Sequence, residues 1–490
     1  MLHEEVTMFQ RLHDRLYRHD AEAGFSIIEV MVAMMVFAVM SIGIAYGIAN
    51  SLQLTQTNRG RETAVALASQ DIDTLRQTAA ASTGGIFRVL SKSGPDNTKT
   101  IGGVEYAIDR KVSWVQSDGA TGACGTSNGK LAYKSVVETV TWPNPRGGSS
   151  TTSVSSAIAP SDAVTDPGYG TVIISVTTAS GAPYEGVGIT ITPVSGGGGA
   201  ALTAAVLPTD AQGCSYAVNV SQGDYAVSAS VTGGIDTNQQ QPSVQSPISV
   251  TAGASSPVPF VYDQSSQLTL QYAAGSKAMI PTNMPTTLSS TAGGLDVVKP
   301  WDLASTSLNI TSSSQPSLPV FPFASGYTVY AGPYSNSTGS ATSCLSPNPS
   351  SWSTPNAANA IGVSPPSVAT APGKPSSASV MMGVATVTGV KDRYITAVSS
   401  ANPAAGDPGC AAGMTMRFPV SAGDTATIAL PFGTWTLYSG TTFGSTTKNE
   451  IASKASNVKP VTNGMVNQKT ALVLINYDNT LTLDPRGQTS

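Results

Sequence analysis

The chain has 490 residues, of which 11% are charged, and its formal net charge at pH 7 is −4. A slightly acidic chain without a run of basic residues is not expected to bind nucleic acid as its main partner. The 48 glycines and 32 prolines are too many for a mainly helical protein, and the length predicts several domains of ordinary size.

The first predicted element is an apolar segment behind a polar leader. Residues 1–24 carry three basic and five acidic side chains and have no apolar core of their own. Residues 25–49 form an apolar run whose only charge is Glu29, and the next charge is Arg59. Because about 20 apolar residues are enough for a helix to cross a bilayer, we predict a membrane helix here rather than the buried core helix of a soluble protein.

The junction between leader and apolar run reads GFSIIE, with Gly24, Phe25 and Glu29 at its key positions. It resembles the processing site of type IV pilins and of the pseudopilins of type II secretion. The resemblance implies that a membrane-embedded prepilin peptidase cuts after Gly24 and methylates the new amine of Phe25, while the apolar segment stays on the mature protein. An ordinary secretory signal, cut among the small residues at positions 41–50, is the alternative.

Glu29 is expected to act in assembly. A carboxylate inside a membrane helix costs about 2.5 to 3.5 kcal/mol on insertion scales, so it requires a partner. In a helical filament that partner would be the N-terminal amine of a neighbouring subunit; alternatively, Glu29 reaches the membrane surface. Gly43 and Gly47 lie four residues apart, which suits either close helix approach or local loosening of the helix.

The helix is predicted to continue to about Ala80, giving an N-terminal helix over residues 25–80 with residues 25–49 in the membrane or filament core. Apolar residues recur among polar ones up to Leu75, which predicts packing of this second half on a globular head. Asp71 and Asp73 lie on different helix faces and are interpreted as solvated surface.

Residues 81–165 are predicted to form a pilin β head, with strands over residues 101–116 and 130–142 closing over the helix. The loop at residues 118–128 has oxygen ligands and glycines but lacks the acidic density of a calcium site, so an ordinary loop is favoured and no metal is expected. The expected fold class is α+β: a long N-terminal helix on a pilin β head, followed by about three all-β Ig-like or transthyretin-like sandwich modules.

The first added module covers residues 166–263. A turn at Asp210 and Gly213, then Gly223 and Tyr225 before an alternating strand, resemble the carboxypeptidase regulatory-like or Cna-B-like sandwiches of surface proteins. Two segments repeat this pattern more weakly, with a proline, a glycine and an aromatic residue before a strand: FPFASGYTVYAG and IALPFGTWTLYSG. They predict β modules at residues 264–345 and 375–490. Linkers are expected at residues 346–374 and 237–256, which are rich in Ser, Asn, Gln and Pro.

The four cysteines are Cys124, Cys214, Cys344 and Cys410, all outside the apolar segment and without CxxC spacing. Extracellular disulfides are the favoured interpretation. Cys344 with Cys410 is the preferred pair, while Cys124 and Cys214 either pair or stay free. Three connectivities remain open.

Residues for histidine-based chemistry are absent beyond the leader, because His3, His13 and His19 all precede Gly24. A processed chain would have no histidine, which excludes Ser-His and Cys-His nucleophiles and His-ligated metals. Without the leader, 22 basic face 24 acidic side chains, a net charge of −2. No catalytic residue and no cofactor are predicted, and no enzymatic function is expected.

The resemblance implies a type IV pilin that assembles through its N-terminal helix. Because extra modules would clash with repeated packing along a filament, we predict a minor, tip-located pilin that presents sandwich modules for adhesion or filament initiation. The expected partners are prepilin peptidase, other pilin subunits, the membrane, and a host or surface protein or glycan. The chain would be single-pass in the inner or cytoplasmic membrane with its bulk extracytoplasmic, then move to the pilus or cell surface. A type II secretion pseudopilin and a membrane-anchored stalk that does not polymerise are the alternatives. The modules favour a Gram-positive host.

Overall fold

The computed structural model describes residues 26–81, 85–94, 97–145, 147–160, 163–292, 295–299, 317–335, 344–447, 454–467 and 480–487. The leader with Gly24 and Phe25 lies outside these residues. The chain divides into two compact units, Met1–Val112 with Lys134–Ser161, and Ser113–Tyr133 with Asp162–Ser490.

The first unit is dominated by the helix α2 (Ile27–Ala80), whose 54 residues correspond to about 80 Å. Its start is capped by Ser26, whose Oγ accepts a hydrogen bond from the Ile28 amide. The helix is continuous through Gly43 and Gly47 and ends at the predicted Ala80. A short 3-10 helix, η1 (Gly85–Arg88), follows.

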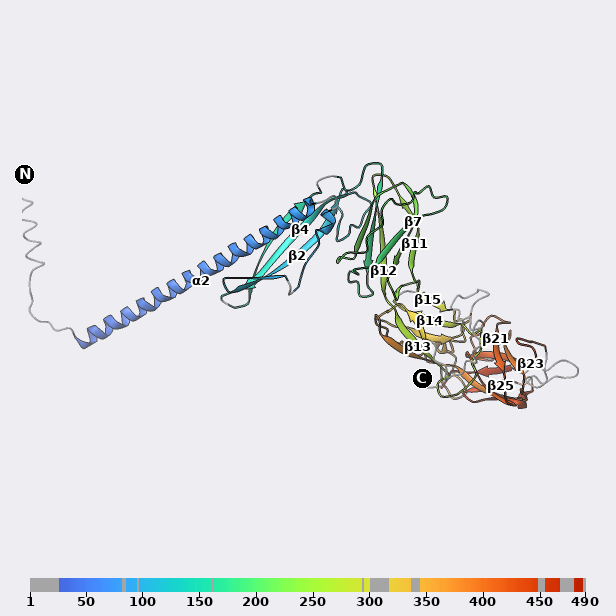
Figure 1. Cartoon of the computed structure of the whole chain (residues 1–490). Coiled ribbons are helices and arrows are strands. Elements are labelled where there is room, and N and C mark those ends of the chain that lie inside the picture. The colour runs from blue at the N-terminus through green and yellow to red at the C-terminus, as the bar shows by residue number, and fades with distance from the viewer. Residues whose placement is uncertain are drawn as a thin grey trace, which may run out of the picture. The chain divides into compact units, whose positions relative to one another are not determined.

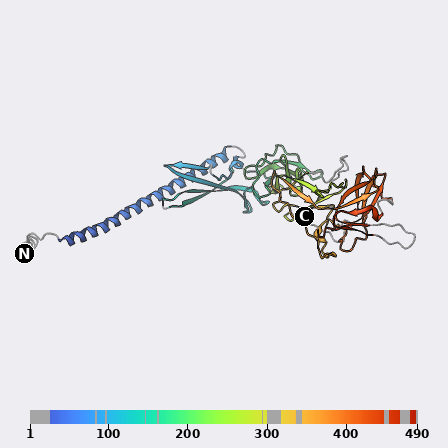
Figure 2. The ribbon, with the colours of Figure 1, turned by 90° about the horizontal axis from the view of Figure 1, so that it is seen from below.

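Only the second half of α2 is packed. Its buried residues recur at intervals of three or four, as expected for one face of a helix: Gly60, Ala64, Leu67, Ala68, Ile72, Leu75 and Ala79. This stripe lies on a sheet, whereas the first half of the helix extends beyond that sheet in both views (Figures 1 and 2).

The sheet under α2 is antiparallel and its main path runs β1-β2-β4-β5, with β3 pairing β2. The strands are β1 (Thr98–Ile101), β2 (Val104–Gln116), β3 (Thr121–Gly122), β4 (Leu131–Pro143) and β5 (Ser149–Ile158). In β4, side chains alternate strictly between the buried face and the other face from Lys134 to Trp142. Tyr106, Ile108 and Val140 join the buried stripe of α2 in one hydrophobic core.

The second unit begins with a sandwich of two sheets, ordered β10-β12-β6-β8 and β11-β9-β7. Its strands are β6 (Gly170–Thr177), β7 (Gly188–Pro193), β8 (Cys214–Val220), β9 (Gly223–Ser230), β10 (Gly234–Asp236), β11 (Ser243–Val250) and β12 (Ser255–Gln264). Both sheets contribute to a core that includes Val172, Tyr225 and Phe260. The expected linker at residues 237–256 is wrong, because β11 and the start of β12 lie within it.

The remaining strands of the described residues form four further sheets: β16-β13-β18, β15-β14-β17, β22-β19-β24 and β21-β20-β23-β26-β25. They are β13 (Ser266–Tyr272), β14 (Thr286–Ser290), β15 (Leu295–Lys299), β16 (Ser317–Val320), β17 (Thr328–Ala331), β18 (Pro375–Val380), β19 (Gly383–Thr388), β20 (Tyr394–Ser399), β21 (Thr415–Val420), β22 (Thr425–Leu430), β23 (Gly433–Gly440), β24 (Val458–Pro460), β25 (Gly464–Asn467) and β26 (Thr480–Leu483). The expected fold class, a long N-terminal helix contacting a β-sheet and followed by several β-sheets, is confirmed.

One hydrophobic core joins residues on both sides of the expected linker at 346–374, for example Leu268, Tyr327 and Phe418. Within that segment lie the 3-10 helix η3 (Pro349–Ser351) and the fully buried Trp352, whose indole Nε1 donates to the Ser346 carbonyl. The boundaries at residues 264–345, 346–374 and 375–490 stay predictions.

Candidate functional site

The most unusual surface in the described residues is the first half of α2. Every residue from Ser26 to Leu52 is exposed, and most of them are apolar. Large side chains such as Phe37 and Met35 are more than 70% accessible. An apolar surface of this size on a single helix is unfavourable in water and indicates that a membrane or another protein covers it. By length and composition, α2 is the one helix of the described residues that could cross a membrane.

Glu29 lies in the first turn of this apolar surface. Together with Val32, Ala33 and Val36 it lines a shallow hollow along the helix. No hydrogen bond or ion pair to another described residue involves its carboxylate. The first turn of a helix has unpaired amides and favours a negative side chain, but in an apolar environment this does not replace an ionic partner. The structure therefore presents a carboxylate in an apolar surface without a charged neighbour among the described residues.

The packed half of α2 is held close to β4 by the absence of a side chain at Gly60. A Cβ atom built at Gly60 would lie 2.6 Å from the indole Nε1 of Trp142. Trp142 is 5% exposed and its ring is 6.1 Å from that of Tyr106. Gly60 is the first buried residue of α2.

A buried ion cluster joins α2 to two strands further along the helix. Arg110 of β2 donates from Nε to Asp71 Oδ2 at 2.8 Å and to Glu138 Oε1 at 2.9 Å, and its Nη2 also pairs with Asp71. The Glu138 side chain is fully buried, and those of Arg110 and Asp71 are 13% and 18% exposed. The interpretation of Asp71 as solvated surface is therefore wrong, because β2 and β4 cover its side of the helix. Asp73 is exposed and pairs with Arg76.

The cluster holds two carboxyl groups and one guanidinium group, so its charges balance only if one carboxyl keeps a proton. Burial, together with the hydrogen bond and negative charge of Asp71, raises the pKa of Glu138 to about 8. Burial also acts against the charged form of Asp71, but the hydrogen bonds of Arg110 and Glu138 and the charge of Arg110 lower the pKa of Asp71. We therefore describe Glu138 as neutral and Asp71 as ionised at pH 7.

Sequence reasoning missed this cluster, although β4 carries a signal for it. Glu138 alternates in phase with Val136, Val140 and Trp142, so the strand period alone places it on the buried face. A buried carboxyl group requires a partner, and the basic residues of the neighbouring strand β2, which include Arg110, are the candidates.

The two disulfides of the structure join Cys124 to Cys214 and Cys344 to Cys410. The first links the loop after β3 to the start of β8, and the second links segments 66 residues apart in the C-terminal half. In the loop at residues 118–128, the buried Gln116 side chain donates to the carbonyls of Ser127 and Gly129. The described part of the chain contains no group of three His, Cys, Asp or Glu residues that could hold a metal ion.

The comparison with protein families bears on the N-terminus. Residues 20–45 match the family model of the prokaryotic N-terminal methylation motif. The match includes Gly24, Phe25 and Glu29, and it implies processing by a prepilin peptidase. With the exposed apolar helix, the motif suggests a membrane-anchored protein whose bulk is extracytoplasmic.

Several solved structures resemble the chain. The TIE protein of Bacillus anthracis is 14% identical, with 72% of this chain and 69% of that chain covered and a TM-score of 0.17. The streptococcal ancillary pilin is 12% identical, with 50% and 86% covered and a TM-score of 0.18. BcpA, the major pilin subunit of Bacillus cereus, is 11% identical, with 34% and 65% covered and a TM-score of 0.15. These TM-scores are too low to support an argument about function. The search among curated proteins found no match.

Proposed function

We propose that this chain is a minor type IV pilin. Prepilin peptidase cuts after Gly24 and methylates Phe25, the first half of α2 enters the filament core, and the β-sheets are carried outward as non-enzymatic adhesive or filament-initiating modules. The observation that carries the proposal is that the residues from Ser26 to Leu52 are all exposed, in one continuous helix whose second half packs firmly on a sheet. A helix that served only as a membrane anchor would not need this rigid continuation.

The size of the second unit supports a minor, tip-located role. A subunit repeated along a filament must fit between neighbours on every side, and sandwich modules beyond the head would obstruct that packing. At the end of a filament no subunit lies beyond, so extra modules are tolerated. The same reasoning applies to a subunit that starts a filament.

Glu29 supports assembly. Its carboxylate lies in an apolar surface with no described partner, and the new amine of a processed neighbour would provide the opposite charge. A pair formed inside an apolar filament core is worth more than one in water, because nothing screens it. This contact would also fix the axial position of one subunit relative to the next.

The proposal is tested on the mature protein from cell envelopes and from sheared surface filaments. We expect intact mass and N-terminal sequencing to find a chain beginning at methylated Phe25 in both fractions. Glu29→Ala should leave the amount of the protein in the envelope unchanged and lower its amount in the sheared fraction at least tenfold. Glu62→Ala is the matched control, because Glu62 is an exposed acid on the same helix outside the apolar surface.

Three results would contradict the proposal. Processing at Phe25 with no dependence of surface display on Glu29 would indicate an anchored stalk that does not polymerise. A processed chain that is required for export of other proteins and is never found in sheared filaments would indicate a type II secretion pseudopilin. A start near residue 50 would refute prepilin processing altogether.

A further inference from the structure

A cavity of about 620 Å³ lies in the C-terminal half of the chain, outside the surfaces discussed above. Its lining comes from four segments, residues 354–360, 404–406, 463–465 and 482–487. The volume falls within the range of about 300 to 1,000 Å³ that is usual for small-molecule sites.

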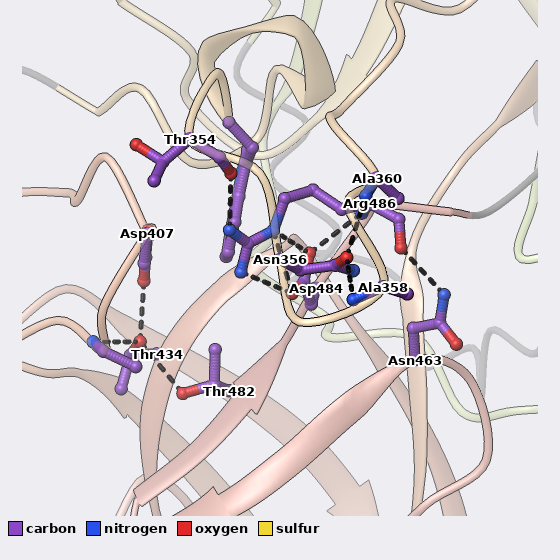
Figure 3. A network of polar contacts seen from close by, with 12 residues as sticks. Thr354, Asn356, Ala358, Ala360, Asp407, Thr434, Asn463, Thr482, Asp484 and Arg486 are labelled. Atoms are coloured by element: carbon purple, nitrogen blue, oxygen red, sulfur yellow. Dashed lines mark hydrogen bonds and ion pairs between the residues drawn. The ribbon is translucent and has the colours of Figure 1, made fainter.

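Arg486 fixes one wall of this cavity. Its Nε and Nη2 donate to Asp484 at 2.9 and 2.7 Å, and its Nη1 donates to the Thr354 carbonyl at 2.7 Å (Figure 3). The guanidinium carbon also lies 5.3 Å from the ring centre of the buried Trp352. The loop after Trp352 is thereby tied to the end of β26.

Asp407 and a disulfide hold residues 404–406, a second part of the lining, in place. The buried Asp407 carboxylate accepts from Thr434 Oγ1 at 2.6 Å, from the Gly409 amide at 2.9 Å, and from Ser346 Oγ. Cys344 and Cys410 covalently join the segments that lead into the two walls. A cavity with walls connected in this way is formed before any ligand arrives, which lowers the cost of binding.

The charges at the cavity are already satisfied. Arg486 is paired with Asp484 through both carboxylate oxygens, and Asp407 accepts three hydrogen bonds. Both charged groups already have partners and do not require an ionic ligand, and the negative charge of Asp407 disfavours anions. The electrostatics therefore favour a neutral ligand.

Three polar groups of the lining remain available. Asn356 Oδ1 accepts hydrogen bonds from the amides of Ala358 and Ala360, whereas its Nδ2 donates to no described residue. Asn463 Nδ2 donates to the Arg486 carbonyl, which leaves its Oδ1 without a partner in the described part of the chain. The Thr354 hydroxyl has no described partner either. The lining residues thus carry an amide donor, an amide acceptor and a hydroxyl that have no partner among the described residues.

The rest of the lining is mostly small and apolar. Five alanines, at positions 357, 358, 360, 404 and 405, leave room for a methyl group that a larger side chain would fill. A hydroxylated ring with an acetamido substituent matches this lining: its amide N–H and C=O complement Asn463 and Asn356, and its methyl group contacts the alanines. An extended peptide matches less well, because the Asn356 and Asn359 amides already donate within the loop.

We propose that this cavity binds a neutral N-acetylated sugar. The inference deepens the adhesive role proposed above by naming a ligand class. Its test does not depend on filament assembly, so the two proposals can fail separately.

The test uses the full chain in detergent micelles. Saturation-transfer NMR and calorimetric titration are carried out with N-acetylglucosamine, N-acetylgalactosamine, glucose, galactose and acetylated, amidated trialanine. We expect one N-acetylhexosamine to bind at least tenfold more tightly than its parent hexose, with the strongest transfer at the acetyl methyl. Ala405→Trp fills the cavity and should abolish binding. Asn356→Asp keeps the acceptor that orders the loop and replaces the donor, and should weaken binding at least tenfold.

Ala182→Trp is the control, since it places the same bulk at an exposed position outside the cavity lining and should leave binding unchanged. Glu29→Ala should also leave it unchanged, even where it prevents assembly. Equal binding of the parent hexoses, preferential binding of the peptide, or binding that survives both cavity variants would each overturn the proposal.

Discussion

At the scale of single residues, Glu138 makes the stability of the head depend on pH. Its folded pKa of about 8 lies above the usual value of 4.5, so its contribution to the free energy of unfolding is complete below about pH 4.5 and is lost as the pH rises to about 8. Glu138→Gln mimics the neutral acid without a proton to lose. We expect the variant to exceed the native chain in stability by about 1 to 3 kcal/mol at pH 9 and to differ little at pH 5.

Hydrogen exchange of the amides at residues 64–79, measured on the full chain at both pH values, would report this difference. Glu105→Gln is the control, because Glu105 is exposed on the neighbouring strand. If native and Glu138→Gln chains lost protection equally between pH 5 and pH 9, the description of Glu138 as neutral at pH 7 would be incorrect.

The residues of the candidate site differ in how far the sequence could predict them. Glu29 stands out because it is a single charge in a long apolar run, and no structure is needed to see that it is unusual. Asp71 looks ordinary, because its burial depends on Arg110 and Glu138, which are 39 residues and 67 residues away along the chain. Local charge patterns carry no information about a partner that only the folded sheet brings near.

At the scale of elements, the contact between Gly60 and Trp142 sets the distance from helix to sheet. Gly60→Ala would place a Cβ atom 2.6 Å from the indole nitrogen. An exposed helical glycine gains about 1 kcal/mol when replaced by alanine, but forcing a buried tryptophan to move costs about 1 to 3 kcal/mol. We expect a net loss of up to about 2 kcal/mol, because overpacking outweighs helix propensity here.

Gly43→Ala provides the comparison, since nothing lies within 4 Å of a Cβ atom at that position. Unfolding by urea, followed through the protection of residues 64–79, should show a lower midpoint for Gly60→Ala and no decrease for Gly43→Ala. A stabilised Gly60→Ala variant would mean that the helix can move away from Trp142 at little cost.

The helices and strands of the structure show which sequence patterns predict secondary structure reliably. The helix and the two long strands beneath it were predicted within a few residues. Their apolar residues recur every 3.6 residues over many helical turns and every second residue along the strands, so the pattern is unambiguous. β11 was mistaken for a linker because its sequence, SVQSPISV, is polar and contains Pro247. Proline is tolerated there because β11 lies at the edge of its sheet, where a missing amide leaves no partner unpaired.

At the scale of the whole molecule, long-range pairing explains what the sequence could not predict. β12 pairs in parallel with β6, and β13 in parallel with β18, across more than 80 residues in each case. Such pairs have no turn between them and leave no local signal. The cavity walls have the same origin, since Thr354 and Arg486, which are joined by a hydrogen bond, are 132 residues apart along the chain.

The disulfide between Cys124 and Cys214 has a mechanical consequence. A chain pulled between α2 and its C-terminal half bears load along its backbone. The disulfide joins cysteines that are 90 positions apart, so the residues between them, with β4, β5, β6 and β7 among them, lie outside that load path. If these residues were unfolded and fully extended, the length of the pulled chain would increase by about 300 Å. We expect single-molecule pulling to show this additional length only after reduction, with Cys124→Ser giving it under oxidising conditions. If the chain acts in adhesion as proposed, the crosslink would keep it from lengthening by this amount when a cell is pulled by flow.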